Sequence, residues 1–502
     1  MRQFFLSSFM KLRLPRLKRM QHYPVETQQL WFETLIRTAA KTEWGQTHFY
    51  NQIRTPQDFA RQVPVQPYEE FYPWIEKCLQ GNASVLWPGK YQWFAKSSGT
   101  TNDKSKFIPV SPEAFQDNHF KAGKDLFASY FETNPYSRMA NGLNLVIGGS
   151  HEVNRLNSGS RSGDLSALLL ENLPALYAHY RTPPKEISLM GEWEKKLERM
   201  AEIVIRQDIR AMTGVPTWLL VLFERLFEMK QLEDKNLLHI WPNLEVFFHG
   251  AVAFGPYREI FRKLIPGDRM QYRETYNASE GFFAFQDQKD SEDLLLLLDH
   301  GIYYEFIPMD QWGNTHANAI GIGDVQLNTN YALVISTNSG LWRYVIGDTI
   351  KFTSLSPYRI RITGRTKHFI NAFGEELIVD NAEVGLQEAC RQTGAMISDY
   401  TAAPVFLEGK NQGLHEWVIE FSIPPEDSDK FIQVLDEKLQ KINSDYAAKR
   451  YQNMAMQMPR LHIARTGTFY QWMKDRGKLG GQNKVPRLSN TREYIETILP
   501  LL

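Results

Sequence analysis

The chain has 502 residues, of which 43% are hydrophobic and 23% charged, an ordinary composition for a globular protein long enough for two or more domains. Lysine plus arginine equals aspartate plus glutamate at 57 each, so no overall charge attracts nucleic acid or an anionic membrane. The two cysteines, Cys78 and Cys390, lack metal-ligand spacing and the histidines form no HExxH pattern, which argues against a zinc or iron site and favours a reducing, cytoplasmic compartment.

The first twenty residues are basic and partly apolar. They contain no small-residue cleavage site, and their short apolar patch is interrupted by Lys11, Arg13, Arg16, Lys18 and Arg19. This pattern favours a basic amphipathic helix packed on the domain, with transient membrane contact as the alternative. The longest apolar runs of the chain are far shorter than the roughly 20 residues that span a bilayer, so we expect neither export nor stable membrane insertion.

A candidate binding loop follows a strand-like run at Tyr91–Ala95. Residues 97–110 read SSGTTNDKSKFIPV, and the polar residues of interest are Ser97, Ser98, Gly99, Thr100, Thr101, Lys104 and Lys106. Short donors and positive charge in a glycine-containing loop can surround the oxygens of a polyphosphate. The spacing differs from the P-loop pattern, and ordinary loop chemistry also explains these residues. The segment by itself leaves both interpretations open.

Helices and strands are predicted to alternate after this loop. Ser111-Pro112 predicts the start of a helix that runs towards Phe131, and Asn144–Ile147 is a short apolar strand. The next predicted elements are helices at Trp193–Arg210 and Thr217–Lys230 and a strand at Glu245–Ala251. Alternation of this kind predicts a largely parallel α/β core.

Residues 276–281 read YNASEG and form a second candidate for a binding segment. The ring of Tyr276 can stack on a nucleotide base, and the carboxylate of Glu280 can hold Mg²⁺ or a positioned water.

The middle of the chain changes character. Strand-like runs linked by tight turns lie at Leu294–Leu298, Ile302–Ile307, Ala332–Thr337 and Trp342–Phe352. They predict a small antiparallel sheet or barrel attached to the core. The last of them contains RYVIGDTIK at 343–351, in which Asp348 can accept both hydroxyls of a ribose, although a Gly-Asp pair is more often a simple turn.

A polar, glycine-containing joint follows the strand predicted at Arg359–Thr363. Gly364–Lys367 suits a hinge, and we place a domain boundary there, between residues 1–363 and 364–502. The second part is predicted to contain a hairpin, helices at Asn381–Gln392 and Asp427–Arg450, strands at Ala403–Leu407 and Glu416–Ile423, and a last strand and helix at 461–473. This is an α+β unit of ordinary domain size.

These segments together resemble the acyl-adenylate-forming enzymes and, within them, the auxin-responsive Gretchen Hagen family of acyl-acid amido synthetases. The resemblance rests on SSGTT with KFIPV, YNASEG, YEFIP at 304–308, RYVIGD, ITGRTKHFINAFGEEL at 362–377, and NKVPR at 483–487. The chain departs from the superfamily pattern at Asn102-Asp103, where a glycine is usual after the second threonine. An acidic side chain beside phosphates would repel them unless it points outward or helps to hold Mg²⁺.

The resemblance implies an α/β fold. It implies a large N-terminal adenylate-forming domain, residues 1–363, with mixed sheets and a small β-barrel-like subdomain that binds ATP and the acyl substrate. Residues 364–502 would form a smaller, mobile α+β domain. The implied partners are a carboxylic acid and an amino acid, with ATP and Mg²⁺. No nucleic acid and no obligate protein partner is implied.

The resemblance also implies roles for individual residues. The nucleotide-binding residues would be Ser97, Ser98, Gly99, Thr100, Thr101, Lys106, His249, Gly250, Ala251, Tyr276, Asn277, Ala278, Ser279, Asp348 and Arg365. Glu280 would act in catalysis by helping to hold Mg²⁺, and the acyl substrate would contact Thr213, Val215 and Phe248. Lys484 would be the catalytic lysine, with Lys478 as the nearby competitor. Core packing also explains Thr213, Val215 and Phe248. A satisfied strand-end histidine and a solvated surface lysine are the simpler explanations for His249 and Lys484.

The predicted reaction is adenylation of an acid followed by amide formation. An acyl-CoA ligase shares the first step and differs in the second nucleophile. A nucleotide-binding sensor or scaffold without catalysis is a further alternative, and a serine hydrolase is the least favoured, because the chain has no convincing GxSxG elbow. The sequence names neither the acid, the amino acid nor the oligomeric state.

Overall fold

The computed structural model describes residues 2–97, 106–148, 153–250, 254–289, 291–313, 318–366, 369–370, 372–373, 375, 377–406, 413–443, 446–447, 450, 456–478, 484–489 and 491–502. Its contacts divide the chain into two compact units. The large unit comprises Met1–Val252, Ile265–Ile346 and Ile350–Arg361. The small unit comprises Ala253–Leu264, Gly347–Thr349 and Ile362–Leu502. The predicted boundary at residue 363 and the mobility of the second domain stay predictions.

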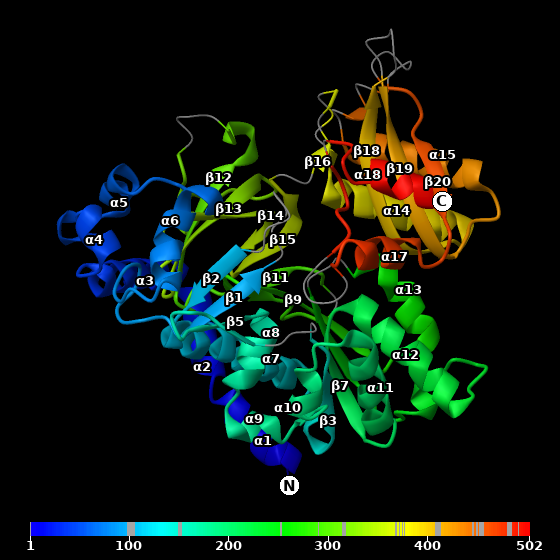
Figure 1. Cartoon of the computed structure of the whole chain (residues 1–502), viewed down its shortest axis with the longest axis horizontal. Coiled ribbons are helices and arrows are strands. Elements are labelled where there is room, and N and C mark those ends of the chain that lie inside the picture. Colours follow the sequence, from blue (N-terminus) through cyan, green and yellow to red (C-terminus); the bar gives the residue numbers. More distant parts are fainter. Residues whose placement is uncertain are drawn as a thin grey trace. The chain divides into compact units, whose positions relative to one another are not determined.

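The main sheet is mixed, which confirms the predicted α/β fold (Figure 1). Eleven strands within the described residues lie in the order β12-β13-β14-β15-β11-β10-β9-β8-β7-β3-β6. Their bounds are β3 Leu143–Val146, β6 Arg181–Thr182, β7 Ile209–Gly214, β8 Val246–Gly250, β9 Gln271–Ala278, β10 Gly281–Phe285, β11 Leu294–Leu296, β12 Ile302–Pro308, β13 Asn330–Thr337, β14 Tyr344–Leu355 and β15 Tyr358–Arg365.

The sheet is parallel at one end and antiparallel beyond β9. Strands β6, β3, β7, β8 and β9 pair in parallel, whereas β10 pairs with both β9 and β11 in antiparallel fashion. Because β11 also pairs with β15, the strands predicted to form a small antiparallel sheet or barrel attached to the core instead continue the large sheet. No closed barrel forms among the strands of the described residues.

Helices accompany these strands through the large unit. Their bounds are α1 Arg2–Lys11, α2 Leu14–His22, α3 Pro24–Ala39, α4 Glu43–Thr47, α5 Pro56–Gln62, α6 Tyr68–Leu79, α7 Phe120–Thr133, α8 Leu165–Glu171, α9 Ala175–Ala178, α10 Lys185–Ser188, α11 Trp193–Val204 and α12 Pro216–Lys230. Ser111 caps the turn before α7 as predicted, since its Oγ accepts a hydrogen bond from Ala114 N. No helix of the described residues is long and apolar enough to cross a membrane.

The helix predicted at Trp193–Arg210 is too long. The α11 helix ends at Val204, and Ile209 already begins β7. Ile209 and Ala211 are buried on either side of the half-buried Arg210, which is the alternation of a strand and not the spacing of a helix.

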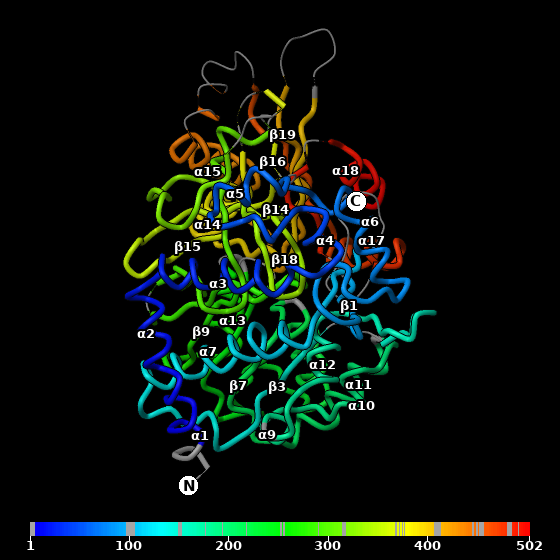
Figure 2. Tube along the Cα trace, turned by 90° about the vertical axis from the view of Figure 1, so that its left-hand side faces the viewer, coloured from blue at the N-terminus to red at the C-terminus, as the bar shows by residue number. Residues whose placement is uncertain are grey.

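The basic N-terminal segment packs on the large unit, as predicted, although as two helices. Both α1 and α2 contact α7, and Figure 2 shows them beside it. Between them, Arg13 donates from Nε to the buried Asp125 at 2.6 Å, and the same carboxylate lies 3.0 Å from His300 Nε2. The apolar residues that turn inward are Leu6, Met10, Leu17 and Met20.

A second sheet of the large unit carries the predicted phosphate loop. Its order is β2-β1-β5-β4, with bounds β1 Trp93–Ser97, β2 Lys106–Val110, β4 Asn154–Arg155 and β5 Arg161–Gly163. β1 and β2 are antiparallel, and Ser97 pairs with Lys106. The loop therefore connects two hairpin strands, and its residues 98–105 lie outside the described part of the chain.

Two of the motif segments meet in a buried ion pair. Glu305 of YEFIP and Arg343 of RYVIGD form it, with Arg343 Nη2 2.9 Å from Glu305 Oε1 and both side chains 6% exposed. Arg343 Nη1 also donates to the carbonyl oxygens of Ala60 and Val63, at 3.1 and 2.8 Å. These residues are therefore structural: they join β12, the start of β14 and the end of α5.

We expect Glu305→Ala to lower the free energy of unfolding by about 3–5 kcal/mol, because it leaves the buried guanidinium without its carboxylate. Glu224→Ala is the matched control, since Glu224 pairs with Lys235 at the surface, with 54% and 53% of the side chains exposed. That loss should stay below about 1 kcal/mol. Denaturant unfolding of both variants measures the difference, and equal losses would contradict the structural role.

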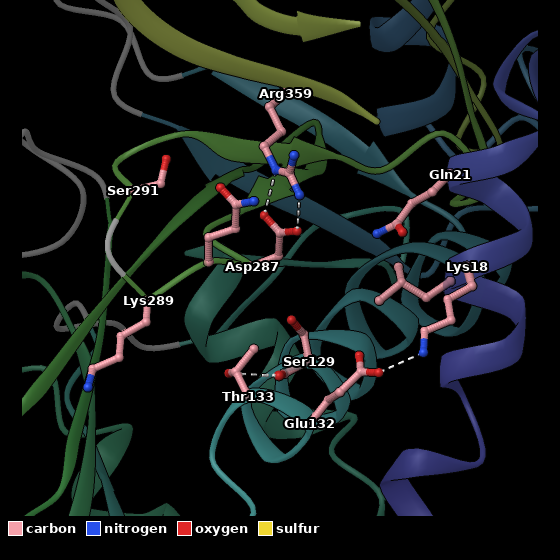
Figure 3. Close-up of a pocket in the computed structure, with 11 residues that line it drawn as sticks. Lys18, Gln21, Ser129, Glu132, Thr133, Asp287, Lys289, Ser291 and Arg359 are labelled. Atoms are coloured by element: carbon pink, nitrogen blue, oxygen red, sulfur yellow. Dashed lines mark hydrogen bonds and ion pairs between the residues drawn. The ribbon is translucent and has the colours of Figure 1, made fainter. Parts of the chain in front are cut away.

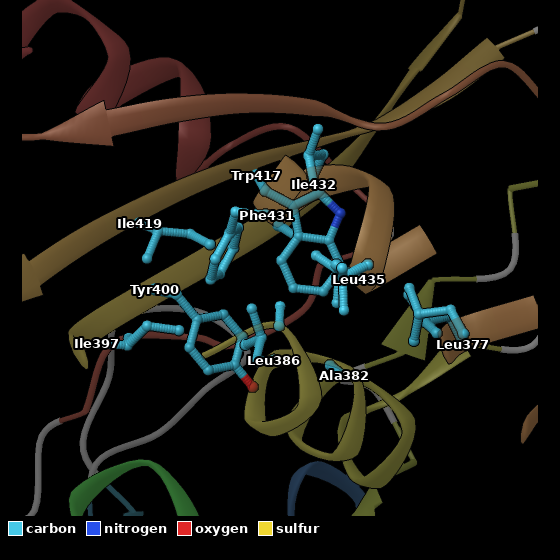
Figure 4. Close-up of a cluster of buried hydrophobic side chains, with 14 of the residues drawn as sticks. Leu377, Ala382, Leu386, Ile397, Tyr400, Trp417, Ile419, Phe431, Ile432 and Leu435 are labelled. Atoms are coloured by element: carbon cyan, nitrogen blue, oxygen red, sulfur yellow. The ribbon is translucent and has the colours of Figure 1, made fainter. Parts of the chain in front are cut away.

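The small unit is an α+β structure, as predicted. Its bounds are α13 Gly255–Leu264, β16 Phe369–Ile370, β17 Leu377–Ile378, α14 Val379–Thr393, β18 Met396–Phe406, β19 Gly413–Ile423, α15 Ser428–Ile442, β20 Arg460–Ala464, α17 Thr468–Asp475 and α18 Ile495–Ile498. β16 and β17 form the predicted hairpin, and β18, β19 and β20 form a sheet. Side chains of this sheet and of α14 and α15 make the core drawn in Figure 4.

Two elements of the small unit differ from expectation. β18 begins at Met396, seven residues before the predicted Ala403. The helix expected at Asp427–Arg450 is interrupted, since α15 ends at Ile442, and Asn443 has extended backbone and donates from Nδ2 to Glu375 O at 3.0 Å. Asparagine suits such an interruption because its short amide competes for backbone partners.

Candidate active site

Residues from three of the predicted motifs come together in the large unit. Lys106 follows the predicted phosphate loop, and its Nζ lies 5.1 Å from the ring centroid of Tyr68. The Tyr68 oxygen accepts a hydrogen bond from Phe107 N at 2.9 Å. Tyr344 donates a long hydrogen bond, 3.5 Å, to Oε1 of the half-buried Glu280. The end of the loop, the YNASEG turn and the RYVIGD strand thus contribute Lys106, Glu280 and Tyr344 to one cluster of polar side chains.

Tyr68 interacts electrostatically with both Lys106 and Glu280. Burial raises the pKa of Tyr68 to about 12, the hydrogen bond from Phe107 N opposes this, and the charge of Glu280 adds to it. Tyr68 therefore stays a neutral phenol at ordinary pH, next to the Lys106 cation and within reach of the carboxylates of Glu280 and Glu69. The sequence interpretation missed it, and the aromatic-rich start of α6 was the only available signal.

The carboxyl ends of β8 and β9 lie side by side. The carbonyl of the buried His249 accepts a hydrogen bond from Thr275 Oγ1 at 3.0 Å. A Cβ on Gly250 would come within 2.5 Å of Thr275 O, so only glycine allows the strands to approach in this way. Because ligands of open α/β sheets bind outside the carboxyl ends of the strands, this edge is a suitable place for the predicted nucleotide.

The residues of the YNASEG turn have separate environments. The Tyr276 ring is buried and lies 4.8 Å from the Phe283 centroid, and Ser279 is also buried. Asn277 is exposed as a residue and hydrogen-bonds the buried His119, whose pKa is lowered to about 4 by its burial. Ala278 is half-buried at the end of β9.

The predicted acyl-binding residues divide into two kinds. Thr213 Oγ1 accepts a hydrogen bond from Asn144 Nδ2 at 3.0 Å, and Val215 directly precedes α12. Phe248 pairs in register with Thr213, but its ring contacts Phe127 and Tyr130 edge-on, at 5.4 and 5.6 Å. Packing between β8 and α7 accounts for Phe248, whereas Thr213 and Val215 lie at the carboxyl end of β7.

The small unit brings together three predicted residues that are far apart in the sequence. Arg365 Nε donates to Asp348 Oδ1 at 2.8 Å, with 41% and 14% of the two side chains exposed. Lys484 lies within the electrostatic reach of both. Gly347, just before Asp348, has a φ of +93°, which favours glycine, and its carbonyl accepts a hydrogen bond from Thr366 N at 2.8 Å.

The surroundings of Lys484 lower its pKa and so favour the neutral amine. Lys484 is exposed as a residue, but desolvation of its ammonium group lowers its pKa to about 8. The positive charges of Arg365 and Arg487 lower the pKa further, and the carboxylate of Asp348 raises it. A lysine with this pKa changes charge near physiological pH, which is typical of residues at functional sites.

Part of the predicted site lies outside the described residues. This holds for Ser98, Gly99, Thr100, Thr101 and Ala251, and of Ser97 only the backbone is described. Within the described residues, no group of three or more histidine, cysteine, aspartate or glutamate side chains could hold a metal ion. A single carboxylate such as Glu280 still fits Mg²⁺ that arrives with a nucleotide, because Mg²⁺ is commonly held by one or two carboxylates and the phosphates.

A cavity of about 540 Å³ lies elsewhere in the large unit, between α2, α7, β15 and the chain after β10 (Figure 3). None of the predicted site residues lines it. Of its three lining cations, Arg359 and Lys18 are paired, with Asp287 and Glu132, at 2.7 Å each, and Lys289 is the third. Three cations against two carboxylates leave little net charge to attract an ionic ligand, so we do not place the active site there.

Comparison with known proteins identifies the family. The chain matches the GH3 family N-terminal domain over residues 13–270, the GH3 family central domain over 295–365 and the GH3 family C-terminal domain over 380–493. The chain belongs to the GH3 family. This confirms the resemblance noted in the motifs.

Relatives of this GH3 chain are named for amide-forming activity. It is 24% identical to indole-3-acetic acid-amido synthetase GH3.4 of Arabidopsis thaliana, over 80% of this chain and 69% of that protein. It is 22% identical to jasmonoyl-L-amino acid synthetase JAR6 of Nicotiana attenuata, over 92% of this chain and 90% of that protein. Matches to two further indole-3-acetic acid-amido synthetases of Arabidopsis thaliana, one of them named as probable, span about half the length of those proteins, 46% each.

Solved structures share the fold of this GH3 chain. The GH3.15 acyl acid amido synthetase superposes with a TM-score of 0.81 at 15% identity, over 97% of this chain and 95% of that one. A 2-hydroxyisobutyryl-CoA ligase, captured in the postadenylation state with 2-HIB-AMP, superposes with a TM-score of 0.59 at 11% identity, over 94% and 90% of the two chains. The fold is therefore that of adenylate-forming enzymes and does not by itself distinguish an amide product from a thioester.

Proposed function

We propose that this GH3 chain is an ATP-dependent acid–amino acid ligase. In the first step, a carboxylate oxygen of the acid bonds to the α-phosphorus of ATP and the bond to the bridging oxygen breaks, so that acyl-AMP and pyrophosphate form. In the second step, the amine nitrogen of an amino acid bonds to the acyl carbon, the bond to the AMP oxygen breaks, and the amine loses a proton. The observation that carries the proposal is the group of Asp348, Arg365 and Lys484 in the small unit.

The chemistry requires activation of the acid, since hydroxide is a poor leaving group and a carboxylate does not react with amines in water. Negative charge grows between the acyl oxygen and the α-phosphate as the adenylate forms, and catalysis of such a transfer depends mainly on positioning and charge. We assign the neutralising charge to the ammonium of Lys484. Lys484 is the first residue of the segment Lys-Val-Pro-Arg at 484–487.

The residues proposed to hold the nucleotide come from both units. Asp348 would accept the ribose hydroxyls, Arg365 would contact ribose or phosphate, and Tyr276 with the His249–Ala251 turn would flank the adenine. The hydroxyls of residues 97–101 and Lys106 would hold the phosphates. Glu280 would help to hold Mg²⁺, which screens the phosphate charges when it is bound. Thr213 and Val215 are the better-supported contacts of the acid, because Phe248 packs in the core.

Substrate identity and compartment are part of the proposal. The names of the relatives differ in their acids, indole-3-acetic acid in one and jasmonic acid in another, so the partners proposed here are a carboxylic acid and an amino acid as classes. We propose a cytoplasmic location, which the two free cysteines support.

The test incubates the purified protein with ATP, Mg²⁺, a panel of carboxylic acids and pooled amino acids, and follows AMP, pyrophosphate and new masses together. We expect a product with the mass of acid plus amino acid minus water, and one AMP per product. If CoA and not amino acids accelerates AMP release, the chain is an acyl-CoA ligase. Binding of ATP without turnover across the panel would instead support the sensor or scaffold.

A further inference from the structure

The segment that carries Lys484 is bound to the edge of β18 by its backbone. Ala402 N donates to Arg487 O at 2.9 Å, and Ser489 N donates to Ala402 O at 3.0 Å. Thr401 Oγ1 adds a hydrogen bond to Pro486 O at 2.7 Å. These bonds fix residues 486–489 as a short parallel addition to the sheet, but Lys484 lies beyond the last of them.

The Arg487 side chain supplies a further set of contacts to the same segment. Its guanidinium donates to Asp399 Oδ1 and, at 3.3 and 3.2 Å, to Tyr400 O and Tyr257 Oη. It also lies 4.6 Å from the centroid of the Tyr400 ring. Only 17% of the side chain is exposed. One side chain thus joins the Lys484 segment to β18 and to α13.

The residues that receive Arg487 are themselves held in the core. The Tyr400 ring lies among apolar side chains of the small unit, with its hydroxyl at the edge of the cluster (Figure 4). That hydroxyl donates to Glu383 Oε1 on α14 at 2.8 Å. Burial raises the pKa of Glu383 and of Asp399, and the positive charge of Arg487 opposes both shifts. The charge of Arg487 therefore favours the ionised form of Glu383 and Asp399. In turn, the carboxylate of Asp399 accepts a hydrogen bond from Arg487 and holds it in place.

We propose that Arg487 is the positioning residue for Lys484: its hydrogen bonds to Asp399, Tyr400 O and Tyr257 fix the segment so that the lysine ammonium stays beside Asp348 and Arg365. This inference rests on the proposed function, in which Lys484 supplies the charge for adenylation. A guanidinium suits the task because its planar fork can bond several acceptors at once, which an ammonium on a flexible stem cannot do in the same geometry.

Arg487 acts on Lys484 in two ways that substitution can separate. Its positive charge lowers the pKa of Lys484, alongside the larger effect of Arg365 on β15 and against the carboxylate of Asp348 on β14. Arg487→Gln removes both the charge and the anchoring, whereas Arg487→Lys keeps the charge and loses the forked hydrogen bonds. If position matters, the two variants behave alike, because a displaced Lys484 returns towards the ordinary lysine pKa in either case.

The experiment measures the position of Lys484 without needing activity. The full chain is labelled with trace acetic anhydride across pH 6–11, and the rate at Lys484 is read by mass spectrometry of peptides from a Glu-specific protease. In parallel, ATP–pyrophosphate exchange gives kcat and KM for the acid that the panel experiment identifies. Arg492→Gln is the matched control, since Arg492 also carries ion pairs, with Glu416 and Glu496, on the same unit but is not among the charges that act on Lys484.

We expect both Arg487 variants to move the labelling midpoint of Lys484 to higher pH and to lower kcat by roughly 100-fold, the scale expected for a displacement of about 1 Å, with KM changed less than about threefold. Tyr257→Phe keeps the buried ring and removes only the hydroxyl that accepts a hydrogen bond from Arg487. It should move the labelling midpoint of Lys484 in the same direction by a smaller amount. Arg492→Gln should leave both readouts within about twofold of the parent.

Two results overturn the inference. If Arg487→Lys matches the parent in both readouts, only the charge of Arg487 matters and it does not position Lys484. If Arg487→Gln and Arg492→Gln give the same labelling curve and the same kcat, Arg487 has only a general structural role. Failure of the proposed function itself would be seen differently, as absence of exchange in the parent chain with every acid, while the labelling midpoints would still report the position of Lys484.

Discussion

Replacement of Lys484 by alanine is expected to lower the kcat of adenylation by about 10²–10³-fold, with little change in KM for ATP. This is the range observed when one group that stabilises transition-state charge is removed, and it corresponds to about 2.7–4 kcal/mol. The small change in KM follows if the lysine acts on charge that grows only during the transfer. Exchange of labelled pyrophosphate into ATP measures the first step separately from amide formation.

The pKa of Lys484 gives this prediction a pH dependence. Because desolvation and Arg365 lower that pKa to about 8, the group is mostly charged below about pH 8 and mostly neutral above it. The kcat/KM of the parent should therefore fall as the pH rises through 8, since the neutral amine cannot stabilise the growing charge. Lys484→Arg should remove this alkaline limb, even at lower overall activity, because a guanidinium stays charged at every pH used.

Lys478 provides the matched control for the assignment. It is the other lysine that the sequence offered, and it follows α17, whereas the charges of Asp348 and Arg365 act on Lys484. Lys478→Ala should keep kcat within about twofold of the parent, because the half-buried Lys478 is not among the charges that act on Lys484 and small effects are usual for substitutions away from a site. A large loss in Lys478→Ala with normal activity in Lys484→Ala would reverse the assignment of the catalytic lysine.

Elements with strong local signals could be predicted from the sequence. Pro216 opens α12 where proline at the first helical position is favoured, and Ser111 caps the turn before α7. The Gly-containing turns separated β11 to β14 correctly. What the sequence could not show is which strands pair, because the contacts of β11 with β15 join residues more than sixty positions apart. The expected small sheet or barrel is therefore part of the large sheet.

In the candidate site, too, the sequence predicts the chemical role of a residue better than its contacts in the fold. Asp348 was predicted from its residue type, because a carboxylate can accept the ribose hydroxyls, whereas Arg365 and Lys484 were predicted only from the resemblance of their segments to the family. Glu305 and Arg343 lay in segments that also looked functional, yet the fold uses them as a buried ion pair. Nothing in a linear pattern tells a buried partner from a ligand-binding residue when both must be charged.

Residues that act through others were missed altogether. Tyr68 and Asp399 carry no motif, and they enter the picture only because α6 and β18 bring them to Lys106 and Arg487. Their roles depend on tertiary contacts between segments far apart in the chain. The sequence could identify groups that meet a substrate more readily than groups that hold those residues in place.

Asp348→Asn is expected to raise KM for ATP by roughly tenfold to a hundredfold, since hydrogen bonds to a charged group contribute about 1.5–3 kcal/mol. It also removes a carboxylate that raises the pKa of Lys484 and that pairs with Arg365 at 2.8 Å. The alkaline limb of kcat/KM, which reports the free enzyme, should therefore move to lower pH. Steady-state assays from pH 6 to pH 10 with varied ATP measure both effects.

Arg365→Gln tests the sign of this argument. The positive charge of Arg365 lowers the pKa of Lys484, so its removal should move the alkaline limb to higher pH, opposite to the shift in Asp348→Asn. Both variants break the same ion pair, so a purely structural effect of losing the pair would move the two limbs in the same direction or leave both in place. Opposite shifts require that Lys484 is the titrating group and that both charges act on it. Parallel shifts would show that Lys484 is not the group whose titration limits kcat/KM, and would contradict its assignment as the catalytic lysine.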